Sequence, residues 1–332
     1  MIRVGLVGCG GIASSHVLSL GNYGDDMAVV ATVDVDESRA SAAAKALNAA
    51  KAVTDYREIL DDVDAVLLSL PHQLHHSIGM DCIAAGKHVL MEKPLANTEE
   101  ECLDLIEAAD KAGLVLMVAY PWPYHPLGVE MQRLIDEKTY GDVFQVSMWT
   151  EQYTKYPEGH WATSVANLGG GQLFSHGCHY IDLLLRYLGN PIEGTHLGTN
   201  YGTPWMEREG TSNVSMKFEN GALGYHFGTW GAKASRLGYS FHAHCTEGML
   251  EMHMASGQLI LHQGAEEKVL LQTRSDKYLN KEAEHFIDCV KTGKRPLTDG
   301  PRSLQSLRVI WKLYEAESNG IVADLRGLGL DM

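Results

Sequence analysis

The chain has 332 residues, of which 45% are hydrophobic and 21% are charged, a composition typical of a globular protein long enough for two domains. Its formal net charge of −15 argues against nucleic acid or an anionic membrane as the main partner, because both are negatively charged. No apolar run approaches the length of a membrane span or a signal-peptide core, and the six cysteines are scattered without a C-x-x-C pair, so we expect a soluble, cytoplasmic protein.

Up to about residue 120, short apolar segments alternate with helical patterns. A helix is expected after Thr98, because Thr98 and Glu101 fit a capping box and Cys102, Leu105 and Ala109 recur on one face. Such alternation predicts a doubly wound parallel sheet in a domain covering residues 1–120. The expected strands are apolar almost throughout, as burial on both faces requires, and span 2–7, 27–35, 65–70, 88–91 and 114–119.

The pattern changes after three closely spaced prolines, Pro121, Pro123 and Pro126. Apolar and polar residues then alternate within several short segments, and Asn220-Gly221 between two of them is a strong hairpin signal. Two amphipathic helical patterns, followed by glycines, close the chain. Residues 121–332 are therefore expected to form an α+β domain whose antiparallel sheet has one buried and one more polar face; its clearest strands are 143–150, 214–218, 241–245 and 250–254.

The segment Gly8-Cys9-Gly10-Gly11-Ile12-Ala13 fits G-x-G-x-x-A, directly after the first expected strand and at the start of a helix. Gly8 would make the tight turn, Gly10 would let the backbone approach a pyrophosphate, and the small Ala13 would let the helix pack closely. The helix N-terminus itself attracts the anion. We expect a dinucleotide to be bound here through Gly8, Gly10, Gly11, Ile12 and Ala13.

Asp34 stands at the end of the second expected strand. A carboxylate at this position accepts hydrogen bonds from the ribose hydroxyls and repels a 2′-phosphate, which favours NAD over NADP. Arg39 weakens this inference only slightly, since we place it on the following helix, and the side chain of Asp36 is expected to point elsewhere.

The segment 86–94 ends an apolar strand in Glu92-Lys93-Pro94. Because Pro94 cannot continue a strand ladder, Lys93 is delivered to the carboxyl end of the strand, where open α/β sheets bind ligands. A lysine that is partly desolvated in such a crevice can act as an acid or base near neutral pH. The alternative is an ordinary surface lysine at a turn.

With these motifs, and with the segments 69–75 and Gly169-Gly170-Gly171, the chain resembles the Gfo/Idh/MocA family, which includes glucose–fructose oxidoreductase and inositol dehydrogenase. The resemblance implies a Rossmann domain, then a domain with a large open sheet that commonly mediates oligomerisation, here as a homodimer or homotetramer. It also implies NAD(P)-dependent oxidation of a secondary alcohol on a sugar or polyol. Glu92 and Lys93 match the family's Glu-Lys-Pro motif, whose Lys–Pro bond is cis in some relatives, and Pro71 and His75 match its cofactor-contacting loop.

The family's second catalytic pattern, G-G-G-x-L-x-D-x-G-x-H-x-x-D, corresponds to 169–182 here. His179 and Asp182 match it, but Ser175 stands where the family has an aspartate. A serine cannot supply charge to a catalytic base, so either Asp182 takes over that role or the neighbouring His176 does new chemistry. Ser175 is as readily a helix cap as a substrate contact, and the alternative for His179 is a hydrogen-bonded core histidine. Pro123 is a second departure, because many relatives carry an arginine there.

Residues 151–168 show little periodicity and are expected to form a loop near the substrate. Tyr153 and Trp161 in this loop are candidates to stack on a sugar ring, although buried packing is the commoner use of such side chains. His176, His179 and Asp182 also invite a metal interpretation, which we disfavour because the third position swings around the helix and no cysteine ligands accompany it. No metal is expected.

Three functions are compatible with these residues. The favoured one is an NAD-dependent dehydrogenase acting on a sugar, glycoside or cyclitol, in which Lys93 takes the hydroxyl proton as hydride leaves, His179 orients the hydroxyl or shares the proton, and Asp182 fixes His179. The second is redox-neutral glycoside cleavage or elimination through a transient keto-sugar. The third is a non-enzymatic sensor of NAD and sugar, against which the retention of Lys93 and His179 argues.

Overall fold

The computed structural model describes residues 1–20 and 26–330, and the chain divides into two compact units. The first unit contains residues 1–124 and 278–303, and the second contains residues 125–277 and 304–332. This division differs from the single boundary expected at residue 120, because a late segment returns to the first unit. The helix in that segment places Ala283, Phe286 and Ile287 in the same hydrophobic core as Leu6 and Met117, which a linear reading of the sequence does not anticipate.

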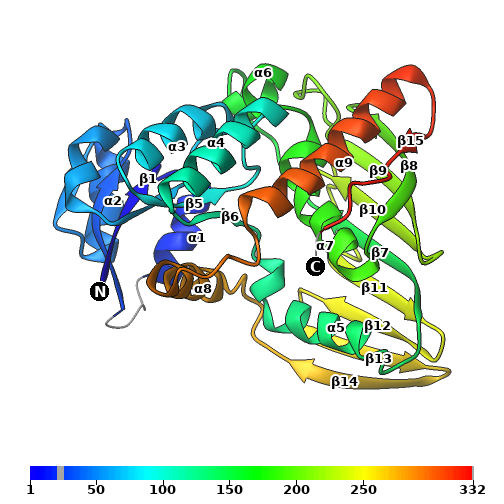
Figure 1. Cartoon of the computed structure of the whole chain (residues 1–332). Helices are drawn as coiled ribbons and strands as arrows, with labels where there is room; N and C mark the ends of the chain where they lie inside the picture. Colours follow the sequence, from blue (N-terminus) through cyan, green and yellow to red (C-terminus); the bar gives the residue numbers. More distant parts are fainter. Residues whose placement is uncertain (21–25, 331–332) are drawn as a thin grey trace. The chain divides into compact units, whose positions relative to one another are not determined.

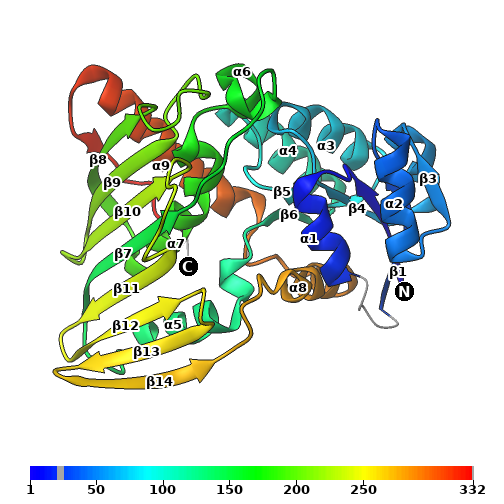
Figure 2. The same cartoon turned by 180° about the vertical axis from the view of Figure 1, so that it is seen from behind.

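The first unit is built on a six-stranded sheet in the order β3-β2-β1-β4-β5-β6, in which every pair is parallel. Helices α1 and α8 lie on one face of this sheet and α3 and α4 on the other, which confirms the doubly wound architecture (Figures 1 and 2). The strands are β1 (Ile2–Val7), β2 (Met27–Val33), β3 (Lys51–Val53), β4 (Ala65–Leu68), β5 (His88–Glu92) and β6 (Leu116–Ala119). The helices are α1 (Gly11–Leu20), α2 (Glu37–Leu47), α3 (His75–Ala84), α4 (Glu99–Ala112) and α8 (Leu279–Thr292).

In the first unit, a local signal is confirmed at helix α4 and the predicted end of strand β2 is corrected. Thr98 accepts the backbone N–H of Glu101, whose carboxylate accepts the backbone N–H of Thr98, so the capping box at the start of α4 is present. Strand β2 ends at Val33 rather than at residue 35, and Val35 is 88% exposed. The reason is that the Asp34 carboxylate accepts the backbone N–H of Asp36 and turns the chain into α2. The short strand β3 was not predicted.

The second unit contains a nine-stranded sheet in the order β14-β13-β12-β11-β7-β10-β9-β8-β15. All neighbouring strands are antiparallel except β7 and β10, so the expected mostly antiparallel sheet is confirmed. The hairpin signal at Asn220-Gly221 joins β9 to β10, with Gly221 at a φ of 85°. The strands are β7 (Val143–Glu151), β8 (Pro191–Thr199), β9 (Thr211–Phe218), β10 (Leu223–Thr229), β11 (Tyr239–Cys245), β12 (Gly248–His253), β13 (Gln258–Gln263), β14 (Glu266–Gln272) and β15 (Ala323–Asp324).

Helices cover one face of this sheet and leave the other face open (Figures 1 and 2). They are α5 (Pro126–Asp136), α7 (Cys178–Leu188) and the second-unit part of α9 (Gly300–Asn319). Residues 151–168 are mostly irregular, as expected, but end in a short 3-10 turn (Trp161–Thr163) and the one-turn helix α6 (Val165–Leu168). Strands β8, β13, β14 and β15 were not predicted; β8 is interrupted by glycines, and β14 is a charged edge strand with no buried face. None of the described helices is long and apolar enough to span a membrane.

Candidate active site

The carboxyl ends of three neighbouring strands meet at one edge of the first unit's sheet. Strand β4 pairs with β1 on one side and β5 on the other, with Leu68 in register with both Val7 and Met91. The loops that follow these strands therefore leave the sheet side by side. This edge is where open parallel sheets bind their ligands, and it carries both the glycine loop and Lys93.

The glycine loop has the geometry that a dinucleotide requires. Gly8 has a φ of 89°, and a Cβ there would lie 2.1 Å from the Ser69 carbonyl oxygen, so packing against the next loop demands glycine. At Gly10 and Gly11 a Cβ would meet no protein atom within 4 Å. The chain's own packing thus does not require these two glycines, whereas the close approach of a pyrophosphate to the N-terminus of α1 would. Ala13 is buried in the core as expected, and Ile12 is 38% exposed.

The end of β2 carries a carboxylate and a guanidinium together. Asp34 is almost buried and accepts the backbone N–H of Cys9 at 2.8 Å, which ties β2 to the glycine loop. Arg39 lies on α2, as expected, but its guanidinium turns back to 3.2 Å from the Asp34 carboxylate. Asp36 points elsewhere, as expected, because it caps α2. The carboxylate suits the ribose hydroxyls of NAD, and the guanidinium suits the 2′-phosphate of NADP. This site therefore has one side chain suited to each cofactor.

A buried cluster of two acids, Glu92 and Glu282, lies next to Lys93. The Glu92 carboxylate accepts the backbone N–H of Lys93 at 3.2 Å and lies 2.7 Å from His16 Nε2 on α1. Burial raises the pKa of Glu92, but the hydrogen bond and charge of His16, with that of Lys93, bring it below its ordinary value. Glu282 on α8 is fully buried, and burial together with the nearby Glu92 raises its pKa well above the ordinary range.

Sequence reasoning missed His16 and Glu282, although both carried a signal. His16 falls on the buried stripe of α1 with Ala13 and Leu20, and Glu282 falls on that of α8. A lone polar residue on an otherwise apolar helix face needs a partner, because burying an unpaired charge is costly. The partner for His16, Glu92, is 76 residues away and cannot be named from spacing.

Lys93 is half-buried directly after β5, and its peptide bond to Pro94 is cis, as the resemblance implied. The Pro94 carbonyl lies 2.8 Å from His75 Nδ1, while His75 Nε2 lies 3.1 Å from the Leu70 carbonyl. His75 is fully buried, and burial lowers its pKa. This histidine therefore ties the turn at Lys93 to the loop after β4, which contains the half-buried Pro71.

The second cluster lies on one helical segment of the second unit. A π-helical stretch (Leu173–Gly177) leads directly into α7, and such stretches are frequent at functional sites. Ser175 is buried on this stretch, while His176 and His179 are half-buried with their rings 6.0 Å apart. The structure thus brings these three candidates together within about one turn of helix.

Three polar side chains lie within hydrogen-bonding distance of the His176 ring nitrogens. Its Nδ1 lies 3.3 Å from Gln172 Nε2, and its Nε2 lies 3.3 Å from the Tyr180 hydroxyl and 3.2 Å from the Tyr239 hydroxyl. Burial raises the pKa of Tyr239 to about 12, so this hydroxyl stays protonated at neutral pH. Sequence reasoning missed Tyr239, which comes from β11 and is 63 residues away.

Asp182 is fully buried on α7 and pairs with Arg186, whose Nε lies 2.6 Å from its carboxylate. The Ser306 hydroxyl donates to its second oxygen at 3.4 Å. These contacts link α7 to α9, and they give the carboxylate partners other than the expected one, His179.

The two aromatic candidates in 151–168 occupy different environments. Tyr153 is 50% exposed, with its ring centroid 6.0 Å from that of Trp205. Trp161 is half-buried and packs against a small hydrophobic cluster that contains Leu168 and Trp230. Exposure thus favours Tyr153 over Trp161 as a contact for a sugar ring.

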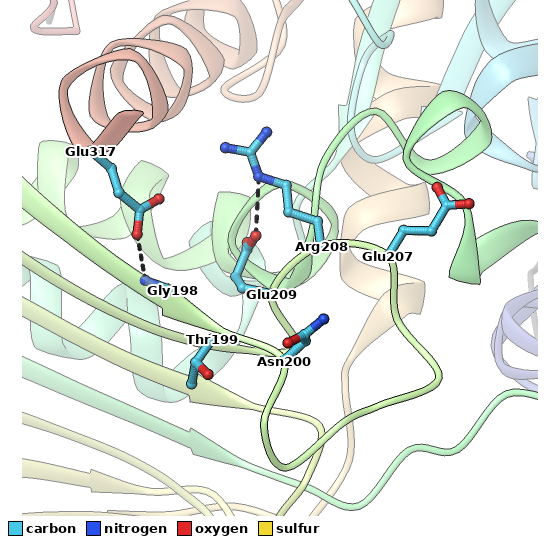
Figure 3. Close-up of a pocket in the computed structure, with 7 residues that line it drawn as sticks. All are labelled: Gly198, Thr199, Asn200, Glu207, Arg208, Glu209 and Glu317. Carbon is cyan, nitrogen blue, oxygen red and sulfur yellow. Dashed lines mark hydrogen bonds and ion pairs between the residues drawn. The ribbon is translucent and has the colours of Figure 1, made fainter. Parts of the chain in front are cut away.

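A pocket of about 320 Å³ lies elsewhere in the second unit and is lined by none of the predicted site residues (Figure 3). Its walls are mainly polar and come from the end of β8, the segment before β9 and the end of α9. They comprise Gly198, Thr199, Asn200, Glu207, Arg208, Glu209 and Glu317. Within the described residues, no group of three or more His, Cys, Asp or Glu side chains is placed to hold a metal ion.

Comparison with known proteins places these features in a family. Residues 2–120 match the description "Oxidoreductase family, NAD-binding Rossmann fold", and residues 129–251 match the "GFO/IDH/MocA C-terminal domain". The chain is 30% identical over 227 residues to "Inositol 2-dehydrogenase 2" of Saccharopolyspora erythraea, a match covering 67% of this chain and 65% of that protein. It is 28% identical to "D-xylose 1-dehydrogenase (NADP(+)) 2" of Haloferax volcanii, over 97% of this chain and 99% of that protein.

The fold is also that of solved structures. One is "Levoglucosan dehydrogenase, complex with NADH", with a TM-score of 0.87 over 98% of this chain and 99% of that one, at 20% identity. Together the two family matches cover more than half of the sequence, and they fall on the two sheets described above. The chain therefore belongs to the Gfo/Idh/MocA family and is an NAD(P)-dependent oxidoreductase.

Proposed function

We propose that this protein is an NAD-dependent dehydrogenase that transfers a hydride between a secondary hydroxyl of a sugar, glycoside or cyclitol and the nicotinamide. The observation that carries the proposal is the shared sheet edge, where the glycine loop after β1 and Lys93 after β5 flank the loop after β4. A proton-transfer group beside a dinucleotide loop is the arrangement that oxidation of an alcohol needs. The named activities of the relatives support the substrate class.

The residues that would hold the cofactor are those of the first unit's sheet edge. Gly8, Gly10 and Gly11, with Ile12 and Ala13, would receive the pyrophosphate at the N-terminus of α1. Asp34 would accept the ribose hydroxyls, while Pro71, His75 and Glu92 would shape the loops around the nicotinamide. When bound, NAD supplies the acceptor for the hydride.

Lys93 is the proposed acid and base. In the oxidation direction its Nζ accepts the hydroxyl proton while the two electrons of the C–H bond leave as hydride, and in reduction it returns that proton. His179 is the proposed partner that orients the hydroxyl, with His176 beside it and Asp182 supporting α7. Ser175, Tyr153 and Trp161 are the proposed further contacts to the substrate.

The test is a steady-state assay with NAD or NADP and a panel of sugars, glycosides and cyclitols, followed at the absorbance of the reduced cofactor. Lys93→Met is expected to lower kcat by about 10²- to 10⁴-fold, the range of general acid–base catalysis, while cofactor binding persists. Lys87→Met is the matched control, because Lys87 precedes the same strand and its Nζ binds the Val63 carbonyl. Equal losses in the two variants, or no turnover of any member by the wild type, would contradict the proposal.

One observation keeps redox-neutral chemistry as a second candidate. Ser175 replaces the aspartate of the family pattern and is buried beside His176, so the charge around the substrate differs from that pattern. In this case purified protein would contain tightly held NAD and would cleave a glycoside without net NADH. Measuring glycoside consumption and NADH in the same reaction separates the two candidates.

A further inference from the structure

The helical segment that carries Ser175, His176 and His179 begins abruptly. The first backbone hydrogen bond of α-helical spacing runs from the Ser175 N–H to the Gly171 carbonyl at 3.0 Å. The N–H groups of the four preceding residues therefore point out of the start of the helix, where no carbonyl of the same helix can accept them. The residue at the cap position, Gln172, makes no side-chain capping bond.

Two residues from distant parts of the second unit accept all four of these N–H groups. The Tyr314 hydroxyl on α9 accepts from Gly171 at 3.1 Å and from Phe174 at 3.2 Å. Glu209 accepts from Leu173 at 3.1 Å through its carboxylate and from Gln172 at 2.8 Å through its backbone carbonyl. The first turn is thus held completely from outside the helix.

The two residues are also joined to each other. The Tyr314 hydroxyl donates to the Glu209 carboxylate at 2.6 Å, so its one proton and both of its acceptor sites are in use. Arg208 completes the cluster, with its Nε 3.2 Å from Glu209 and its guanidinium 3.5 Å from the centre of the Tyr314 ring. Figure 3 shows Arg208 and Glu209 side by side. A carboxylate at a helix N-terminus is further favoured by the helix dipole.

The glycines before the helix fit this arrangement. A Cβ on Gly171 would lie 2.2 Å from a Glu209 carboxylate oxygen, and one on Gly170 would lie 2.5 Å from Phe174 Cβ. Gly169 has a φ of 85° and ends α6. The glycine triplet therefore lets Glu209 and Tyr314 approach the backbone closely.

We propose that Glu209 and Tyr314 are positioning residues that fix the start of the catalytic helical segment and thereby the placement of Ser175, His176 and His179. This inference rests on the proposed function of those three residues. In the proposed function, neither Glu209 nor Tyr314 contacts substrate or cofactor. A misplacement of about 1 Å in such a segment can cost about 10²-fold in rate, so the loss is expected in kcat.

The test compares Tyr314→Phe with Tyr187→Phe. Both changes remove one hydroxyl from a buried tyrosine of the second unit, but within the described residues the Tyr187 hydroxyl has no hydrogen-bond partner. Tyr314→Phe is expected to lower kcat roughly 10- to 100-fold at a temperature well below unfolding, with KM for NAD unchanged. Tyr187→Phe is expected to change neither.

Amide hydrogen exchange supplies a readout without substrate. Exchange at Gly171 and Phe174 is expected to accelerate in Tyr314→Phe and not in Tyr187→Phe. Equal kcat values in the two tyrosine variants would overturn the proposal even if the proposed function stands. If the wild-type chain oxidises no alcohol, the proposed function fails, while unchanged exchange in Tyr314→Phe would separately overturn the positioning role.

A second pair of variants is needed if Tyr314→Phe does not fold. Glu209→Gln keeps an oxygen that accepts from Leu173 and Tyr314, whereas Glu209→Ala removes it. Glu209→Gln is expected to retain kcat within about threefold and Glu209→Ala to lose it as Tyr314→Phe does. Equal kcat in these two variants would contradict the inference.

Discussion

We expect cofactor choice to depend on two side chains, Asp34 directly after β2 and Arg39 on α2. Asp34 presents a carboxylate that suits the ribose hydroxyls of NAD, and Arg39 presents a guanidinium 3.2 Å away. Because Asp34 also accepts N–H groups from Cys9 and Asp36, its position is set by the backbone, whereas Arg39 is half-exposed and can turn. We therefore expect NAD to be preferred, and the preference to depend on Asp34.

The corresponding prediction uses Asp34→Ser. This variant is expected to lower kcat/KM for NAD about tenfold and to raise it for NADP, because the charge that repels the 2′-phosphate is gone and Arg39 keeps an ion pair with Asp36 alone, at 3.4 Å. The measurement is kcat/KM with both cofactors at one substrate concentration series. Asp55→Ser is the control, since Asp55 caps the 3-10 helix (Tyr56–Asp62) after β3, a serine preserves that cap, and Asp55 pairs with Arg57 rather than with Arg39. An unchanged NAD to NADP ratio in Asp34→Ser would show that the preference lies elsewhere.

At the scale of single residues, the sequence predicted positions better than partners. Gly8, Asp34 and Lys93 lie at strand ends where the local pattern placed them, because a strand, a turn residue and a helix start are short-range features. The contacts of the His75 ring and the His16–Glu92 pair join separate elements. They could not be predicted locally, because they exist only once the sheet order brings those elements together. Asp182 shows the same limit, because its spacing from His179 predicted one partner and the fold supplied Arg186.

The packing of α7 on β10 buries a histidine that must stay neutral. His226 is fully buried, lies 3.1 Å from the Thr150 hydroxyl and stacks on Tyr180 at 4.9 Å between ring centroids. Burial, with a smaller contribution from His196, lowers its pKa from 6.5 to about 3. Between about pH 3 and pH 6.5, the unfolded chain therefore binds a proton at His226 that the folded chain does not bind.

Stability is therefore expected to fall as the pH drops from about 6.5 toward about 3, by up to about 1.4 kcal/mol per pH unit from this histidine. The contribution is fully present above the pKa of the unfolded chain. His226→Gln removes the titrating group, so its free energy of unfolding should decline less steeply between about pH 7.5 and about pH 4.5. Urea unfolding of both proteins across that range is the measurement. Parallel declines would show that other groups dominate.

Elements with a clear hydrophobic period or a recognisable cap or turn could be predicted from the sequence. Elements whose conformation depends on contacts with distant parts of the chain could not. The capping box of α4 and the β9–β10 hairpin are local and were identified from the sequence. The π-helical stretch (Leu173–Gly177) was not, because nothing in its own composition distinguishes it from an α-helix and the residues that accept the N–H groups at its start, Glu209 and Tyr314, are far away in the sequence.

The open face of the second unit's sheet exposes apolar side chains. Leu197 is 72% exposed and Leu223 is 53% exposed, and both lie on the face that the helices leave open, as do Trp149 and Tyr225. Large apolar side chains on a sheet face that no helix covers favour an interaction site. We therefore expect a second copy of this chain to cover it, giving a homodimer or homotetramer.

Sedimentation velocity of the wild type and of Leu197→Glu with Leu223→Glu tests this expectation. The wild type should sediment as a dimer or tetramer, and the double variant should shift toward the monomer, because two carboxylates would be buried without partners. Val129→Glu is the control, since Val129 is 51% exposed on α5, on the other face of the sheet. A monomeric wild type would contradict the expectation.

For the whole molecule, the sequence by itself determined most of the strands and helices, the glycine loop, the strand end at Lys93 and the change from a parallel to an antiparallel sheet. These features depend on residues within about one turn or one strand of each other. The tertiary structure alone decided that α8 joins the first unit, that His16 and Glu282 lie near Glu92, and that Glu209 and Tyr314 accept the N–H groups at the start of the helical segment that leads into α7. Those contacts join residues far apart in the chain, and their free energy arises only when folding excludes water from them.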